Sequence, residues 1–590
     1  MNYELNVEQN KQELSSWNAI HSLWPLLSGE HGILIYAGIA TLANSIVNLI
    51  APLLIAHIID TYIVARRFNG VITFAVILFL LYAVGLFTRY AQTRLMGGVG
   101  QRVLFAVRIQ IFEKLQELPV AFFDANKAGD LISRINNDTD NLNQFFSQSL
   151  VQFFGSIAIM AGAAIFLLII NIKLGMAALA PAAMLFLFTR IISPWVKRMN
   201  TTSLASTGDL SAEISESLAN FKAIVAFNRR DFFRKRFKTA NDDNYRAAIR
   251  AGIANNTFTP VFGLSSNIAQ LVVLAYGIYL ITTGNFTIGL LISFLSYAAN
   301  FYNPLRQLAA LWANFQIALA GWDRISAILQ MKNEMTTIPV STATVSVRHQ
   351  TDALLAFSHV SFGYVKGVDV LHDVNFTLKP GRTYALVGPT GGGKTTTASL
   401  MARLYDPSKG TIYLNGQDIR TFTAAERAHK IGFILQEPML FSGTVRENIL
   451  YGNEASRHFS NEELTQALHD AGLERLLVRF NEGLETKVAT SGGALSLGQK
   501  QLIAFMRAVL RNPDLLILDE ATANIDTVTE QLLDDILKKL PSRTTRVIIA
   551  HRLNTIEHAD EIFFVNGGKI IRAGSMKHAV DMLLHGKRKS

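Results

Sequence analysis

The chain has 590 residues, of which half are hydrophobic and only 17% are charged, and its formal net charge is +10. This length allows several domains, and the absence of cysteine excludes disulfides and thiolate metal sites. A net positive charge can indicate a protein that binds nucleic acid. Here the excess of Lys and Arg fits loops that lie beside anionic lipid headgroups, such as residues 195–200 and 227–238, so no nucleic-acid partner is expected.

The N-terminal segment, residues 1–29, is not expected to be a secretory signal peptide, because it has acidic residues and no basic start before an apolar core. Its apolar side chains fall on one helical face, which predicts a short helix in the membrane interface. A helix packed on the membrane domain is the alternative. These side chains are Trp17, Ile20, Leu23, Trp24 and Leu27.

Long runs without Asp, Glu, Lys or Arg occupy the first half of the chain, at residues 32–59, 68–88, 141–172 and 251–305. A membrane-spanning helix needs about 20 predominantly apolar residues, and buried helices of soluble proteins rarely extend so far without a charge. The last run is long enough for two spans, with a turn at Gly284 and Asn285. Six spans are therefore predicted, near 32–59, 68–92, 141–170, 172–194, 256–282 and 286–310.

Two long charged segments with helical periodicity separate spans two and three (89–140) and spans four and five (193–255). They are predicted to leave the membrane as helical extensions on the face that also carries the C-terminal half. We therefore expect an all-α transmembrane domain over 1–330, a linker over 331–352, and an α/β domain over 353–590. In that last part, runs such as TYALVG, IGFILQ, DLLILD and TRVIIA alternate with helical patterns, which predicts a largely parallel sheet.

The strand TYALVG runs into GPTGGGKTT, which matches the phosphate-loop pattern G-x-x-x-x-G-K-[ST] between a strand and a helix. Glycines let backbone N–H groups approach phosphate oxygens, Lys394 reaches the outer phosphates, and the Thr395 hydroxyl can bind Mg²⁺. The predicted phosphate-binding residues are Gly388, Pro389, Thr390, Gly391, Gly392, Gly393, Lys394, Thr395 and Thr396.

The run LLILDE at 515–520 is typical of a buried strand that ends in two carboxylates. Asp519 is placed to hold Mg²⁺, and Glu520 to orient or deprotonate an attacking water. The alternative is that the pair caps the following helix, and the upstream phosphate loop disfavours it.

A second candidate anion site lies in SGGALSLGQKQ, residues 491–501, which precedes the helical pattern QLIAFMRAVL. A glycine-rich start with a hydroxyl at a helix N-terminus attracts anions, because unpaired N–H groups and the helix dipole point outward. Ser496 is predicted to begin that helix.

In this order, Tyr364, GPTGGGKT, Gln436, LSLGQKQ, LLILDEATANID and His551 resemble the nucleotide-binding domain of an ATP-binding cassette (ABC) transporter. The six spans resemble the membrane half of the exporter-type subfamily, as do the stretches 122–138 and 302–325. The likeness covers nearly the whole chain and implies an exporter-type half-transporter.

The resemblance implies a role for each matching residue. Tyr364 would stack on adenine, Gln436 would touch Mg²⁺ and the attacking water, His551 would bind the γ-phosphate, and Asp526 would shape the dimer contact. Ser496, Gly498 and Gln499 would bind ATP held by a second half-transporter, either the same or a different chain. The implied cofactors are ATP and Mg²⁺, and the implied catalytic residues are Glu520, His551 and Gln436.

Two departures from the family pattern leave the homodimer and the heterodimer both open. Leu497 stands where the signature usually has Gly, which adds bulk beside the partner's nucleotide. Ala489 and Thr490 stand where many exporters have a Gly-Glu pair, which removes a carboxylate that could contact a partner's loop.

We therefore expect an ATP-hydrolysing subunit of a multi-pass transporter in a bacterial inner (plasma) membrane, with its ATPase domain in the cytoplasm. The spans hold few ionisable groups, which favours export of an amphipathic drug, lipid or peptide. A polar cavity lined by side-chain amides is also open, although helix-to-helix hydrogen bonding by the same amides is the simpler interpretation. These amides belong to Asn44, Asn48, Asn255, Asn256, Gln270 and Asn300.

Two further functions stay open at the level of sequence. An importer of a metal chelate could use the same exporter-type fold in the reverse direction. An ABC ATPase without a transport function could pair its signature segment and phosphate loop in the same way, but the charge-free spans disfavour it.

Overall fold

The computed structural model describes residues 3, 5, 24–333, 335, 337–339, 352–365, 367–489, 495–519, 527–549, 559–573 and 578. The chain divides into two compact units. A helical unit comprises residues 7–115 and 129–330, and a second, mainly α/β unit comprises residues 331–590 together with 1–6 and 116–128. Most of the predicted linker and of the predicted interfacial helix lies outside the described residues; of the latter, Trp24–Leu27 form a 3₁₀ turn.

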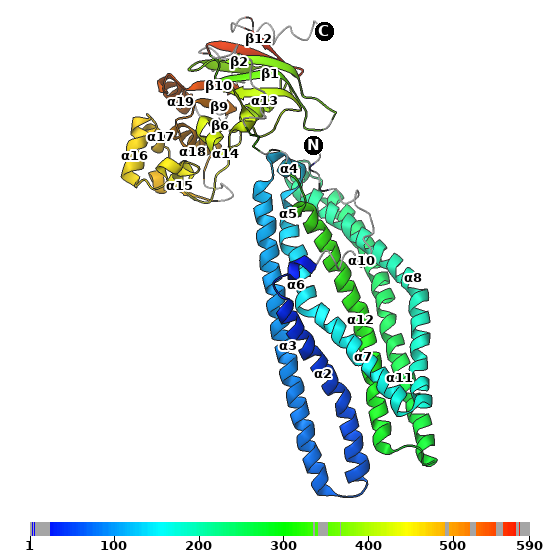
Figure 1. Ribbon diagram of the computed structural model, residues 1–590. Coiled ribbons are helices and arrows are strands. Elements are labelled where there is room, and N and C mark those ends of the chain that lie inside the picture. Colours follow the sequence, from blue (N-terminus) through cyan, green and yellow to red (C-terminus); the bar gives the residue numbers. More distant parts are fainter. Residues whose placement is uncertain are drawn as a thin grey trace. The chain divides into compact units, whose positions relative to one another are not determined.

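Long helices make up the helical unit (Figure 1). Each predicted span overlaps at least one of these long helices. Gly284 (φ 75°) lies in the turn between the last two long helices of the unit, as predicted. Within the described part of the chain, five stretches are long and apolar enough to cross a membrane: His31–Ile63, Phe68–Glu117, Ala128–Ile170, Ile172–Ala219 and Arg230–Thr282. The main helices are α2 (His31–Ile58), α3 (Phe68–Glu117), α7 (Leu150–Ile170), α8 (Ile172–Ala219), α10 (Arg230–Asn256), α11 (Phe258–Thr282) and α12 (Ile288–Leu329).

The sixth predicted span, 286–310, falls mostly in α12, which begins at Ile288 and is not among these five stretches. Polar side chains of α12 donate hydrogen bonds to backbone carbonyls of α2. Ser293 Oγ donates to the Pro52 carbonyl (2.5 Å), Tyr297 Oη to the Leu49 carbonyl (2.5 Å), and Asn300 Nδ2 to the Asn48 carbonyl (3.4 Å). Pro52 lacks the N–H that would bond Asn48, so Asn300 meets a carbonyl that the proline leaves free.

Helix-to-helix bonding is thus confirmed for several of the amides considered as cavity linings. Asn44 Nδ2 donates to the Gly85 carbonyl of α3, and Asn200 and Asn255 exchange two bonds of 2.9 Å between α8 and α10. Polar groups that satisfy one another this way can lie within a membrane domain at low cost.

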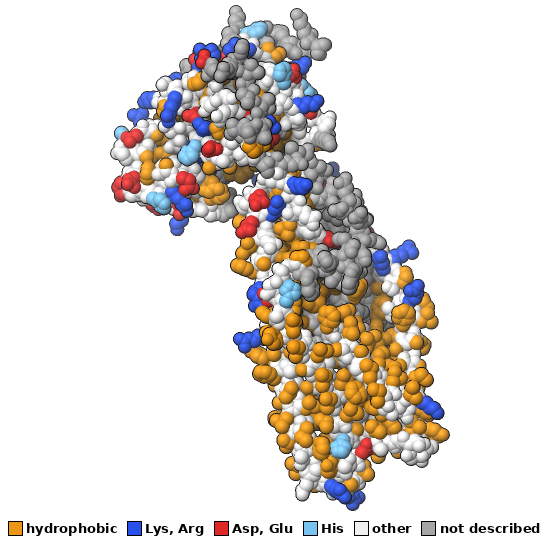
Figure 2. Space-filling view, viewed as in Figure 1, with side chains coloured by type: hydrophobic (Ala, Val, Ile, Leu, Met, Phe, Trp, Pro, Cys, Tyr) orange, Lys and Arg blue, Asp and Glu red, His pale blue; other side chains and the backbone are white. Residues whose placement is uncertain are grey.

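The outer surface of the helical unit is strongly apolar along most of its length (Figure 2). Phe79, Leu86, Phe87 and Met184 each expose more than 70% of their surface. In water this would be a large penalty, whereas lipid is as apolar as these side chains. The surface therefore fits a bilayer.

The helical structure predicted for both extensions is confirmed. Helix α3 continues unbroken to Glu117, and α8 continues to Ala219. The shorter elements that link these extensions to the next spans are α4 (Val120–Ala125), α5 (Ala128–Ser133), the π-helices η3 (Arg134–Asp138) and η4 (Phe145–Ser149), α6 (Thr139–Gln144) and α9 (Phe221–Ala226).

A six-stranded sheet forms the centre of the second unit, in the order β12-β11-β3-β10-β9-β6. All neighbours pair in parallel except β11 with β12, so the predicted parallel sheet is confirmed. Its strands are β3 (Thr383–Val387), β6 (Ile431–Ile434), β9 (Leu515–Asp519), β10 (Thr545–Ile549), β11 (Glu561–Asn566) and β12 (Lys569–Arg572).

An antiparallel sheet, not predicted, packs with this one in the order β2-β1-β4-β5. Alternate residues of the parallel strands join two separate cores, since Leu516 and Leu518 pack among helices while Leu515 and Ile517 pack toward the second sheet. Covering on both faces explains why these strands are continuous apolar runs in the sequence. The antiparallel strands are β1 (Leu355–Phe362), β2 (Leu371–Leu378), β4 (Lys409–Leu414) and β5 (Gln417–Asp418).

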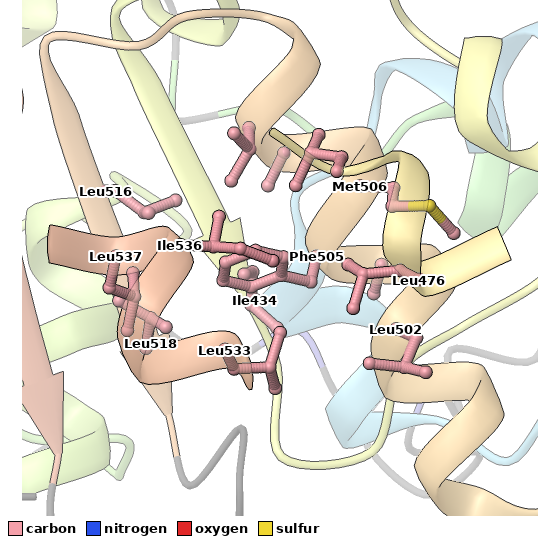
Figure 3. Close-up of a cluster of buried hydrophobic side chains, with 14 of the residues drawn as sticks. Ile434, Leu476, Leu502, Phe505, Met506, Leu516, Leu518, Leu533, Ile536 and Leu537 are labelled. Carbon is pink, nitrogen blue, oxygen red and sulfur yellow. The ribbon is translucent and has the colours of Figure 1, made fainter. Parts of the chain in front are cut away.

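The helical core holds α18 against the sheet. Phe505 of α18 is 1% exposed and lies among Ile434 of β6, Leu516 and Leu518 of β9, and side chains of α19 (Figure 3). The helix start and the strand end that carry candidate site residues are therefore fixed by one packed cluster. Besides α4, the α-helices among the described residues of this unit are α13 (Lys394–Met401), α14 (Ala424–Lys430), α15 (Val445–Leu450), α16 (Asn461–Asp470), α17 (Glu474–Leu477), α18 (Leu497–Leu510) and α19 (Thr527–Lys539), beside a short ribbon of β7 (Gly443–Thr444) and β8 (Lys487–Val488).

Candidate functional site

Three of the predicted site segments meet at one edge of the parallel sheet. Strands β3, β10, β9 and β6 are parallel neighbours, so their carboxyl ends lie together. The phosphate loop follows β3, Asp519 ends β9, and Gln436 comes two residues after β6. This edge is where open α/β sheets bind their ligands.

The phosphate loop has a backbone that other residues would not allow. A side chain at Gly388 (φ 149°) would place its Cβ 2.0 Å from the Val565 carbonyl oxygen, and Gly393 (φ 109°) caps the N-terminus of α13. Lys394 is 5% exposed, and its Nζ donates to the carbonyls of Gly388 (2.9 Å) and Pro389 (3.1 Å). The loop is therefore shaped as a cradle around a buried cation, which fits a polyphosphate.

Thr395 and Asp519 lie close enough to share a metal ion. The Thr395 hydroxyl is 3.5 Å from Asp519 Oδ1, and the Asp519 side chain is almost fully buried at the end of β9. A hydroxyl and a carboxylate beside a phosphate cradle are oxygen ligands of the kind that Mg²⁺ prefers. The described residues therefore fit the predicted cofactor.

Tyr364 and Gln436 lie on exposed segments at the rim of this site. Tyr364 lies two residues beyond β1, is 47% exposed, and donates from its hydroxyl to Thr396 Oγ1 of α13 (3.2 Å). The phosphate-loop helix thus fixes one end of an aromatic ring whose face is available to a base. Gln436 is exposed on the loop after β6.

Ser496 caps α18, as the sequence predicts. Its hydroxyl accepts from the Gln499 N–H (3.1 Å), and Gln499 Oε1 accepts from the Ser496 N–H (2.9 Å). The Gln499 side chain also donates to the Arg479 carbonyl (2.8 Å). Leu497 is 38% exposed beside this capped start, so the residue that departs from the family pattern faces outward.

Several predicted site residues lie outside the described part of the chain, and their roles stay predictions. They are Glu520, Asp526, His551, Thr490 and residues 491–494.

The sequence did not single out Tyr405 or Asp124. Tyr405 follows α13, and its hydroxyl donates to Asp124 Oδ2 of α4, 281 positions away in the chain. A lone tyrosine in a loop carries no periodic signal, so only the packed structure brings the two together.

Comparison with known proteins matches both halves of the chain. The family described as the ABC transporter transmembrane region matches residues 34–305, and the family described as ABC transporter matches residues 371–523. A fatty acid ABC transporter ATP-binding/permease protein of Mycobacterium bovis is 33% identical over 84% of this chain and 77% of its own length. A multidrug resistance ABC transporter ATP-binding and permease protein of Lactococcus lactis subsp. cremoris is 33% identical over 82% of this chain and 80% of its own length.

The fold is also similar to a solved structure. A bacterial Atm1-family ABC exporter with ATP bound aligns with a TM-score of 0.76 and 24% identity, over 95% of this chain and 97% of the other.

Proposed function

Since the chain belongs to the ABC transporter family and joins a transmembrane region to an ATPase domain, we propose that it is a half-transporter that exports an amphipathic compound. The observation that carries its ATPase chemistry is the meeting of Lys394, Thr395 and Asp519 at one sheet edge. The proposed spans are the six predicted ones, with α12 as the sixth, in a bacterial inner membrane.

Each site residue has its own proposed role in ATP binding and hydrolysis. The phosphate-loop N–H groups and Lys394 hold the β- and γ-phosphates, and Tyr364 stacks on adenine. Thr395, Asp519 and Gln436 hold Mg²⁺, which when bound neutralises charge on the phosphates. Glu520 takes the proton of the attacking water, and Gln436 and His551 position that water and the γ-phosphate.

Glu520→Gln tests this assignment most directly. The amide keeps the shape of the side chain but cannot accept the proton, so we expect turnover to fall about 10²–10⁴-fold while ATP affinity stays near that of the wild type. Turnover is measured as phosphate release and affinity as equilibrium ATP binding, both on the full-length protein in lipid nanodiscs.

Lys394→Met is the control, because it removes a phosphate contact and should weaken binding itself. Near-normal turnover in Glu520→Gln would remove this residue from the role of base.

An apolar cavity in the helical unit supports an amphipathic cargo. It has a volume of about 690 Å³, within the range of small-molecule sites, and the described residues that line it include no ionisable side chain. Aromatic rings on α12, α7 and the π-helix before α7 are among its lining residues: Phe145, Phe146, Phe153, Phe154, Trp312 and Phe315.

Cargo and direction are tested in the same preparation. The two relatives are named for fatty acids and for drugs, so oleate and tetraphenylphosphonium are suitable probes. In inside-out vesicles, export predicts ATP-dependent accumulation of one of them. ATP-driven loss from preloaded vesicles would support the importer instead.

A further inference from the structure

Tyr405 contacts both the proposed ATP site and the segment 116–128, which we call the first cytoplasmic loop. Its ring centroid lies 5.2 Å from that of Tyr364, nearly perpendicular at 89°, and 5.4 Å from that of Phe362. Its hydroxyl donates to the Asp124 carboxylate of α4. One side chain thus touches the ring proposed to stack on adenine and a charged group of the loop.

The side chains of two residues that flank Tyr405 in the chain form an ion pair. Arg403, whose side chain is 1% exposed, donates to Asp406 from Nε (2.9 Å) and Nη2 (3.3 Å), so an ion pair brackets Tyr405 in the chain. Burial raises the pKa of the Tyr405 hydroxyl, and the Asp124 carboxylate adds to the shift. The hydroxyl therefore stays protonated near neutral pH and remains a donor to Asp124.

Helix α4 packs with the ATPase domain although it belongs to the membrane half of the sequence. Residues 116–128 fall in the same compact unit as the ATPase domain. Phe122 of α4 is fully buried, and Asn333 Nδ2 donates to the Glu117 carbonyl (2.6 Å). Only Leu118 and Pro119 separate α4 from α3. A displacement of Asp124 would therefore act on a segment that follows directly from α3.

We propose that Tyr405 is a positioning residue through which α4 senses the nucleobase at Tyr364, so that the first cytoplasmic loop responds to adenine and not only to the phosphates. This rests on the proposed adenine role of Tyr364. A base stacked on the exposed face of Tyr364 fixes that ring. Because the Tyr405 ring abuts it and the Tyr405 hydroxyl is bonded to Asp124, the restraint passes to α4.

Hydrogen exchange on the full-length protein in lipid nanodiscs reports this restraint directly. The probes are AMP-PNP, which carries a base, and inorganic tripolyphosphate, which does not. AMP-PNP should slow exchange in peptides covering both 388–402 and 116–128, whereas tripolyphosphate should slow it only at 388–402. Tyr405→Phe removes one hydroxyl and should lose most of the slowing at 116–128 while keeping it at 388–402.

Tyr413→Phe, on β4 of the same domain, is the matched control and should behave as the wild type. Equal slowing at 116–128 by both probes, or unchanged slowing in Tyr405→Phe, would overturn the proposal. Tyr364→Ala tests the premise separately, since it should weaken AMP-PNP binding and leave tripolyphosphate binding unchanged. Unchanged AMP-PNP affinity there would reject the adenine role itself.

Discussion

At the scale of single residues, the Ser496 side chain at the start of α18 has one observed role and one proposed role. The Ser496 hydroxyl caps its own helix through Gln499, and the family pattern also assigns it to the partner's phosphate. The helix cap and the proposed phosphate contact therefore fall on the same residue, and the exposed side chain of Leu497 lies directly beside it.

Replacing Leu497 with Gly tests the departure from the family pattern. We expect ATP-driven dimer closure to strengthen, since bulk beside the partner's nucleotide is removed, while the Ser496–Gln499 capping box stays intact. A glycine in the first helical turn should cost less than about 1 kcal/mol of stability. Cross-linking yield against ATP concentration measures closure, and a weaker response than the wild type would show that the leucine aids the contact.

At the scale of elements, α3 contains glycines at 97, 98 and 100 yet stays helical throughout. Their surroundings differ. A Cβ at Gly97 would meet no atom within 4 Å, while one at Gly100 would lie 2.5 Å from Asn143 Oδ1 and 2.8 Å from Ser147 Cβ. Gly100 thus permits close packing, and Gly97 adds backbone freedom only.

The two glycines form a matched pair of substitutions. Gly97→Ala should stabilise the protein by up to about 1 kcal/mol through helix propensity, whereas Gly100→Ala should destabilise it by about 1–3 kcal/mol through overpacking. Thermal unfolding in nanodiscs measures both changes. Stabilisation by Gly100→Ala would contradict the close packing described for that position.

Patterns in the sequence predict elements better than the contacts between them. Apolar runs predicted β3, β6, β9 and β10, because strands covered on both faces carry no polar alternation. The second sheet was missed, since polar residues interrupt the apolar runs of its strands, as in β1 (LAFSHVSF) and β2 (LHDVNFTL). Tyr405 and Asp124 have no local signal at all.

At the scale of the whole molecule, the chain carries one phosphate loop and one signature segment, so the proposed transporter needs a second subunit to complete two ATP sites. Ser496→Ala tests this arrangement. It should impair ATP-dependent dimer closure and leave ATP binding to the separate subunit nearly unchanged, because the proposed role of the serine is to contact the partner's nucleotide.

Loss of the helix cap is a confounding effect of about 1 kcal/mol, and Ser460→Ala controls for it. Ser460 caps α16 with the same capping box, through Glu463, away from the site. Equal loss of closure in both variants would assign the effect to capping alone. Native mass measurement of the purified complex then shows whether the second subunit is the same chain.

Helix α3 also has a mechanical consequence. Its 50 residues make a rod about 75 Å long, more than twice the hydrocarbon thickness of a bilayer. A tilt of about 5° at the Glu117 end would swing the Phe68 end by about 6–7 Å if the rod stays straight. A lever of this length would turn a small rotation beside α4 into a displacement comparable with the width of a small molecule.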